Sequence, residues 1–186
     1  MVDSSLERLK TSHGVQVTWH AFELRPKGSP PISDDYRAYI ESQRPRLEAV
    51  AREHFGLNIN PGPFGIDSRP AMIGAKYAAE QGKGYVYNQA MLRAYWQAGQ
   101  DISQLTVIQD VAEHVGLDVE QFTAALENPK YEAEVDADIA QARAYGITGV
   151  PALLFVNKYL VVGAQPYGEL VRILEQIQEH EAKHDN

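Results

Sequence analysis

Two histidines and a glutamate near the carboxyl end have the spacing of a zinc-binding motif. His180-Glu181-Ala182-Lys183-His184 matches the pattern H-E-x-x-H. On a helix this pattern places both imidazoles on one face to bind zinc, with the glutamate as general base. The flanking residues are polar, and no apolar run or further ligand accompanies the motif. We therefore interpret it as a solvated helix end and predict no metal site.

Other side chains that could take part in catalysis or binding form weaker patterns. The 186 residues contain no cysteine, which excludes a disulfide scaffold, a cysteine zinc site and thiolate catalysis by these residues. His20 lies in an alternating segment, where a half-exposed or hydrogen-bonded histidine is the commoner outcome. Five aromatic residues could line a substrate groove, although helix packing is their commoner role: Tyr77, Tyr85, Tyr87, Tyr95 and Trp96. We predict no catalytic residue and no cofactor.

Composition excludes several classes of partner. The net charge is -8 and no run of Lys or Arg interrupts it, so nucleic acid and anionic membranes are not expected partners. No stretch approaches the roughly 20 apolar residues of a membrane helix, and the first residues show no basic segment followed by an apolar one. We expect a soluble cytoplasmic protein.

The elements that would position these residues follow from periodicity and turn signals. Alternation predicts a strand over 15–24, and capping residues at 33–35 open a helix to about 55 with a kink or break at Pro45. Further helices are predicted over 70–99 with an interruption at 82–84, over 104–115 with a cap from 101–103, from 118 to 128 and over 129–145. Apolar runs at 152–156 and 159–163 predict a hairpin, followed by a helix over 167–184. Strands at both ends suggest one sheet interrupted by a helical region.

Three stretches resemble the DsbA family, and its FrnE-like cytoplasmic branch in particular. The first is W-H-A-F-E-L-R-P from Trp19 to Pro26, and the second runs from Leu92 to Ile102. The third is Y-G-I-T-G-V-P-A-L-L-F from Tyr145 to Phe155, followed by G-A-Q-P from Gly163 to Pro166. G-I-x-G-V-P before a strand, with G-A-Q-P after a hairpin, is the most specific pair.

The resemblance implies an α/β fold, with a thioredoxin-like sheet that is incomplete at its N-terminal side and an inserted all-helical domain. We expect residues 1–26 and 146–186 to form the thioredoxin-like domain and residues 27–145 the helical insertion. The resemblance also implies a cis bond before Pro151, and substrate binding by Val150 and Pro151. In isolation, Gly149-Val150-Pro151 would indicate an ordinary trans proline at the start of a strand.

The chain departs from the family pattern at its start. The family's first strand ends in Cys-x-x-Cys at a helix N-terminus, where the helix dipole stabilises the thiolate. The helix that follows the motif corresponds here to residues 6–10, so the strand and both cysteines would precede Met1. We favour a shortened start over natural loss of the redox chemistry. Without its central strand, the sheet would have open edges, which favours association such as a homodimer.

The expected function is that of a DsbA-like thiol–disulfide oxidoreductase by family, with this chain itself redox-inactive. Two alternatives stay open: a redox-silent binding module with a thioredoxin fold, and a glutathione-dependent isomerase or transferase of the kappa class. The expected partner is a thiol- or disulfide-containing protein, or a small thiol such as glutathione.

Overall fold

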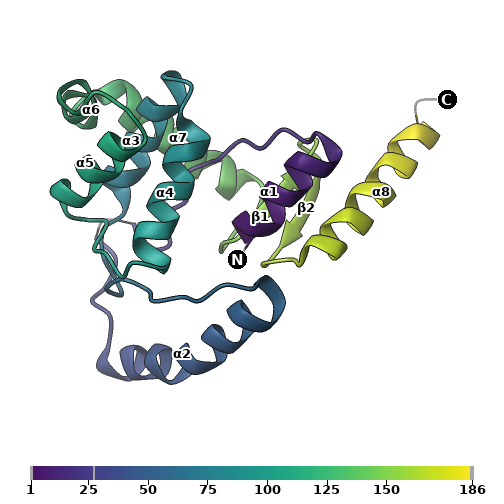
Figure 1. Ribbon diagram of the computed structural model, residues 1–186, viewed down its shortest axis with the longest axis horizontal. Helices are drawn as coiled ribbons and strands as arrows, with labels where there is room; N and C mark the ends of the chain where they lie inside the picture. The colour runs from purple at the N-terminus through teal and green to yellow at the C-terminus, as the bar shows by residue number, and fades with distance from the viewer. Residues whose placement is uncertain (1, 27, 185–186) are drawn as a thin grey trace. The chain divides into compact units, whose positions relative to one another are not determined.

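The computed structural model describes residues 2–26 and 28–184. The elements in chain order (Figure 1) are α1 (Val2–His13), α2 (Asp34–Phe55), α3 (Arg69–Glu80), α4 (Gly84–Trp96), α5 (Leu105–His114), α6 (Val119–Leu126), α7 (Pro129–Ala144), β1 (Ala152–Phe155), β2 (Tyr159–Val162) and α8 (Tyr167–His184). The chain divides into two compact units. Unit 1 comprises residues 1–17, 49–57 and 149–186, and unit 2 comprises residues 18–48 and 58–148. The division expected at residues 26–27 and 145–146 stays a prediction.

Unit 1 is built on the predicted hairpin. β1 and β2 pair antiparallel, with Leu153 opposite Val161 and Phe155 opposite Tyr159. The turn places Val156 and Asn157 at φ 45° and 57°, a left-handed conformation that Asn adopts more readily than most residues. Alternate residues of a strand share one face. Leu153 and Phe155 accordingly both pack against the apolar cluster formed by Leu6 and Leu9 of α1 and Leu170 of α8.

Unit 2 contains the helical bundle α3 to α7. Its largest fully buried side chains include Tyr87, Phe122 and Ile108. Gly74 of α3 permits a close approach inside the bundle, because a Cβ there would lie 2.6 Å from both Phe122 Cζ and the Tyr87 hydroxyl oxygen. The core of the bundle therefore depends on a glycine at this position.

Helix starts follow the local signals in most cases. Ser33 Oγ accepts from the N–H of Tyr36 at 3.2 Å, and Asp118 and Asn128 cap α6 and α7 through their side chains. The cap expected from 101–103 is different: α5 begins at Leu105 without a side-chain cap, and Asp101 accepts from Ser103 instead. α2 continues unbroken through Pro45.

The strand predicted over 15–24 is not formed. Residues 14–23 are assigned neither strand nor helix, although half-buried and exposed residues alternate from Val15 to His20 as the prediction requires. A strand exists only when a second strand accepts and donates its backbone hydrogen bonds. In the described part of the chain no strand lies against this segment, and the sheet contains β1 and β2 alone. The described chain is thus mostly helical, with the incomplete sheet that the resemblance implied.

Candidate functional site

The start of β1 is the site that the sequence singled out. The Val150–Pro151 peptide bond is cis, as the resemblance implied. The carbonyl of Pro151 accepts from the N–H of Gly163 at 2.8 Å, which extends the pairing of the hairpin by one step. Val150 makes no backbone hydrogen bond to the hairpin, and the residue is 51% exposed. Val150 and Pro151 therefore present an accessible backbone segment next to a strand.

Hydrogen-bonding groups are available along this segment. Among the described residues, neither the N–H nor the C=O of Val150 has a backbone partner. β1 pairs with β2 on one edge, and within residues 2–26 and 28–184 no strand pairs with its other edge. Exposed backbone groups at a sheet edge accept an added extended strand. The groups available at this edge are therefore main-chain donors and acceptors without a backbone partner.

The apolar cluster of unit 1 holds this edge in position. Leu153 and Phe155 anchor β1 to Leu6, Leu9 and Leu170, which are 6%, 1% and 0% exposed. α1 lies in the same unit and packs against α8. Its first turn carries serines but no cysteine. These residues therefore offer no nucleophilic sulfur beside β1.

His20 belongs to a different arrangement, in unit 2. Its Nδ1 lies 2.9 Å from Oδ1 of Asp138, while the N–H of Ala21 and Nζ of Lys76 donate to Oδ2 at 2.6 Å and 2.5 Å. Asp138 is 8% exposed. Burial alone would raise the pKa of its carboxyl group, but the bonds from Lys76, Ala21 and His20 hold that pKa below its usual value. The carboxylate is fully engaged and anchors the segment after residue 18 to α7.

A second ionic group anchors the same segment. Arg69 donates to Glu23 at 2.8 Å and to Asp136 at 2.5 Å, and Glu132 lies 3.5 Å away. Hydrogen bonds to Asp136 and Glu23 raise the pKa of Arg69. Sequence reasoning missed both anchors. One signal for Asp138 was present, because it shares the buried stripe of α7 with Val135, Ile139 and Ala142.

The aromatic residues considered as a groove are divided between core and surface. Tyr77 and Tyr87 are 6% and 0% exposed and pack edge-on or tilted against Phe122. Burial raises the pKa of Tyr87, as expected of a core phenol. Tyr85 and Tyr95 are half-buried, and Trp96 is 38% exposed. These rings do not line one groove.

In the H-E-x-x-H motif, Glu181 makes hydrogen bonds to two residues of the hairpin. Glu181 Oε1 accepts from Lys158 Nζ at 2.8 Å and from the Tyr159 hydroxyl at 2.5 Å. Both bonds lower the pKa of Glu181, and they tie α8 to the hairpin. The side chain of His184 lies outside the described residues. Within those that are described, no group of three potential metal ligands occurs.

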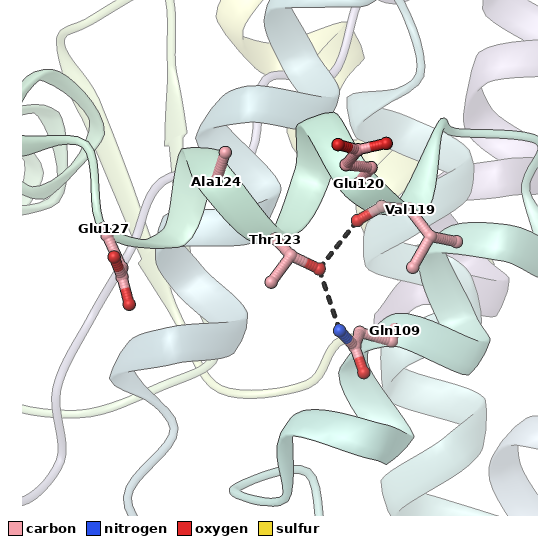
Figure 2. Close-up of a pocket in the computed structure, with 6 residues that line it drawn as sticks. All are labelled: Gln109, Val119, Glu120, Thr123, Ala124 and Glu127. Carbon is pink, nitrogen blue, oxygen red and sulfur yellow. Dashed lines mark hydrogen bonds between the residues drawn. The ribbon is translucent and has the colours of Figure 1, made fainter.

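A surface depression between α5 and α6 is lined by polar groups that are hydrogen-bonded to each other. Figure 2 shows that Gln109 donates to Thr123 Oγ1, which in turn donates to the carbonyl of Val119. The distances are 2.8 Å and 2.7 Å. The bond from Gln109 to Thr123 joins α5 to α6. No helix within residues 2–26 and 28–184 is long and apolar enough to cross a bilayer.

Comparison with known proteins identifies one sequence relative and several similar structures. Uncharacterized protein YwbO of Bacillus subtilis (strain 168) is 35% identical over 123 residues, which are 63% of this chain and 60% of that protein. The matched region is thus less than two thirds of that relative. A probable DsbA oxidoreductase from Streptomyces coelicolor superposes with a TM-score of 0.75 at 24% identity, over 93% of this chain and 81% of the other.

A 2-hydroxychromene-2-carboxylate isomerase superposes with a TM-score of 0.78 at 18% identity, over 99% of this chain and 90% of the other. At such identities both structural similarities concern the fold. The family model of the DSBA-like thioredoxin domain matches residues 1–175, which is nearly the whole chain. The incomplete sheet, the helical insertion and this match lead to one conclusion: the chain belongs to the DsbA-like thioredoxin domain family.

Proposed function

We propose that this chain is the substrate-binding part of a DsbA-like thiol–disulfide oxidoreductase. It binds an extended thiol- or disulfide-bearing peptide beside Val150 and Pro151, and by itself it exchanges no disulfide. The observation that carries the proposal is the accessible, unpaired backbone of Val150 at the start of the open edge of β1. A peptide strand there gains main-chain hydrogen bonds, and side chains on alternate positions add specificity.

The redox part of the proposal follows from the chemistry of exchange. A thiolate attacks one sulfur of the substrate disulfide, expels the other sulfur as a thiolate and forms a mixed disulfide, which a second thiolate then resolves. The 186 residues supply neither thiol. Exchange by the family mechanism therefore requires a cysteine pair contributed from outside these residues. Purified alone, the chain should not catalyse insulin reduction by dithiothreitol.

Peptide binding tests the site directly. The probe is a fluorescein-labelled eight-residue peptide of alternating valine and threonine, with one central cysteine blocked as a mixed disulfide with glutathione. We expect Val150→Asp to weaken binding at least about tenfold, because a charge at a pairing position disfavours strand addition. Val162→Asp is the matched control: Val162 is 65% exposed and lies on β2. Equal effects of the two variants on fluorescence anisotropy would refute the assigned edge.

The two alternative functions predict different results in binding experiments. A redox-silent binding module would show the same peptide affinity, but the protein from its native cells would carry no cysteine pair. A glutathione-dependent isomerase or transferase would bind free glutathione through a serine at the start of α1. Ser5 is 3% exposed, whereas Ser4 is half-buried, so Ser4 is the more accessible of the two serines in this turn. Saturable glutathione binding that Ser4→Ala or Ser5→Ala abolishes would favour this alternative. The cytoplasmic location expected from the sequence stays a prediction.

A further inference from the structure

α2 buries little of its surface in the described chain. Of its 22 residues, Ala51 alone is buried. A helix in a folded protein owes most of its stability to the packing of one face. Tyr36 and Tyr39 of α2 are nevertheless 48% and 56% exposed. Residues 34–48 of the helix, which belong to unit 2, therefore include no buried residue and leave both tyrosine rings exposed.

The exposed rings form one cluster. Tyr36 stacks on Tyr39 with ring centroids 6.3 Å apart and an interplanar angle of 25°. Phe64, which is 38% exposed, lies 6.1 Å from the ring of Tyr36. A contiguous exposed cluster of aromatic rings is typical of an interaction surface, since Tyr is enriched at protein interfaces.

The charged residues along α2 indicate which kind of partner the exposed face fits. Residues 34–41 carry three carboxylates and one arginine, whereas residues 42–55 carry three arginines and two glutamates; these groups are Asp34, Asp35, Arg37, Glu41, Arg44, Arg46, Glu48, Arg52 and Glu53. The first eight residues of α2 thus have a formal charge of -2 and the following fourteen a formal charge of +1. Among the described residues, the only salt bridge of these side chains joins Arg44 to Glu48. A helix of this charge pattern is complementary to itself when reversed.

Residue spacing places the complementary groups on one flank. Asp35, Tyr39 and Arg46 are four and seven residues apart and share one side of α2. We propose that α2 docks a second copy of this chain through an antiparallel, two-fold contact. Asp35 then faces Arg46 of the second copy, and the reverse pair repeats the contact. That arginine also approaches the exposed ring of Tyr39, where the ring face attracts the guanidinium group.

The overall charge is consistent with this location. The chain carries a net charge of -8, which opposes self-association over most of the surface. α2 contains five carboxylates and four arginines, so its own surface is nearly neutral. The helix offers two copies a contact with little long-range repulsion.

A charge exchange between two variants tests the proposal. Sedimentation velocity of the full chain over micromolar concentrations should show a monomer–dimer equilibrium. Asp35→Arg and Arg46→Asp should each raise the dimer dissociation constant at least about tenfold, because each places like charges opposite one another twice. An equimolar mixture should restore the wild-type constant within about threefold, since both contacts again join opposite charges.

The mixture separates an interface effect from misfolding, because two misfolded variants would not restore a dimer. Circular dichroism of each variant checks the helix content. A wild-type chain that stays monomeric up to 100 micromolar protein (an order of magnitude above the constants of weak dimers) would overturn the proposal. Dimers of undiminished affinity in both single variants, or a mixture that stays monomeric, would also overturn it.

Discussion

Asp138 provides the most quantitative test of how unit 2 is held together. In Asp138→Asn the side chain keeps one acceptor oxygen, but its nitrogen becomes a donor that faces at least one of three existing donors. Lys76, whose side chain is 16% exposed, loses its counter-charge. Hydrogen bonds to charged groups contribute roughly 1.5–3 kcal/mol each, and an uncompensated buried charge costs more. Because His20 is 53% exposed and can turn to water, we expect a loss of about 2–4 kcal/mol.

Urea unfolding monitored by tryptophan fluorescence measures this loss. The chain has two tryptophans, Trp19 and Trp96, and both belong to unit 2. With a urea dependence of about 2 kcal/mol per molar, the midpoint should fall by roughly 1–2 M. Asp136→Asn is the matched control. Asp136 also bonds a cation but is 61% exposed, so its loss should cost less than about 1 kcal/mol. Equal midpoints for the two variants would refute the anchor.

The pH dependence has a defined sign. The pKa of Asp138 is lower in the folded state than in the unfolded state, so its contribution is complete above the unfolded value of about 3.9. The contribution is lost as the pH falls through the lower folded value. The difference between wild type and Asp138→Asn should therefore be constant from about pH 5 to pH 8 and shrink below about pH 4. A difference that grows on acidification would contradict this assignment.

Two further predictions concern packing. Gly74→Ala should destabilise unit 2 by about 1–3 kcal/mol, because the new methyl group would lie 2.6 Å from Phe122 Cζ; urea unfolding checks this, and an unchanged midpoint would contradict it. Leu9→Ala should destabilise the α1–α8 contact by about 2–4 kcal/mol, since Leu9 is 1% exposed in that cluster. Hydrogen exchange of α8 amides should then accelerate, while amides of α7 in the other unit serve as the control.

The parts of the fold that local signals encode were predictable from the sequence. The start of α7 is determined by Asn128 as cap and Pro129 as the first residue, two neighbouring residues with known preferences. The hairpin follows from two apolar runs flanking a turn. The cis bond at Pro151 was implied by resemblance to a family, because no local pattern separates it from a trans bond.

Long-range features were not predictable in the same way. From Val15 to His20 the alternation correctly separates half-buried from exposed residues, but a strand also needs a neighbouring strand, and periodicity carries no information about that neighbour. The bond between His20 and Asp138 joins residues 118 positions apart. Its partners become visible only when the bundle brings α7 beside the segment after residue 18.

The most direct test of the account is a nitrogen-15 amide spectrum of the full chain titrated with the glutathione-blocked peptide. The account predicts saturable shifts centred on Val150 and the residues of β1, because an added strand pairs with their backbone groups. It also predicts that the bound peptide keeps its disulfide, since the chain contains no cysteine. Shifts confined to amides of α3 to α7, or no shifts at millimolar peptide, would contradict the assigned site.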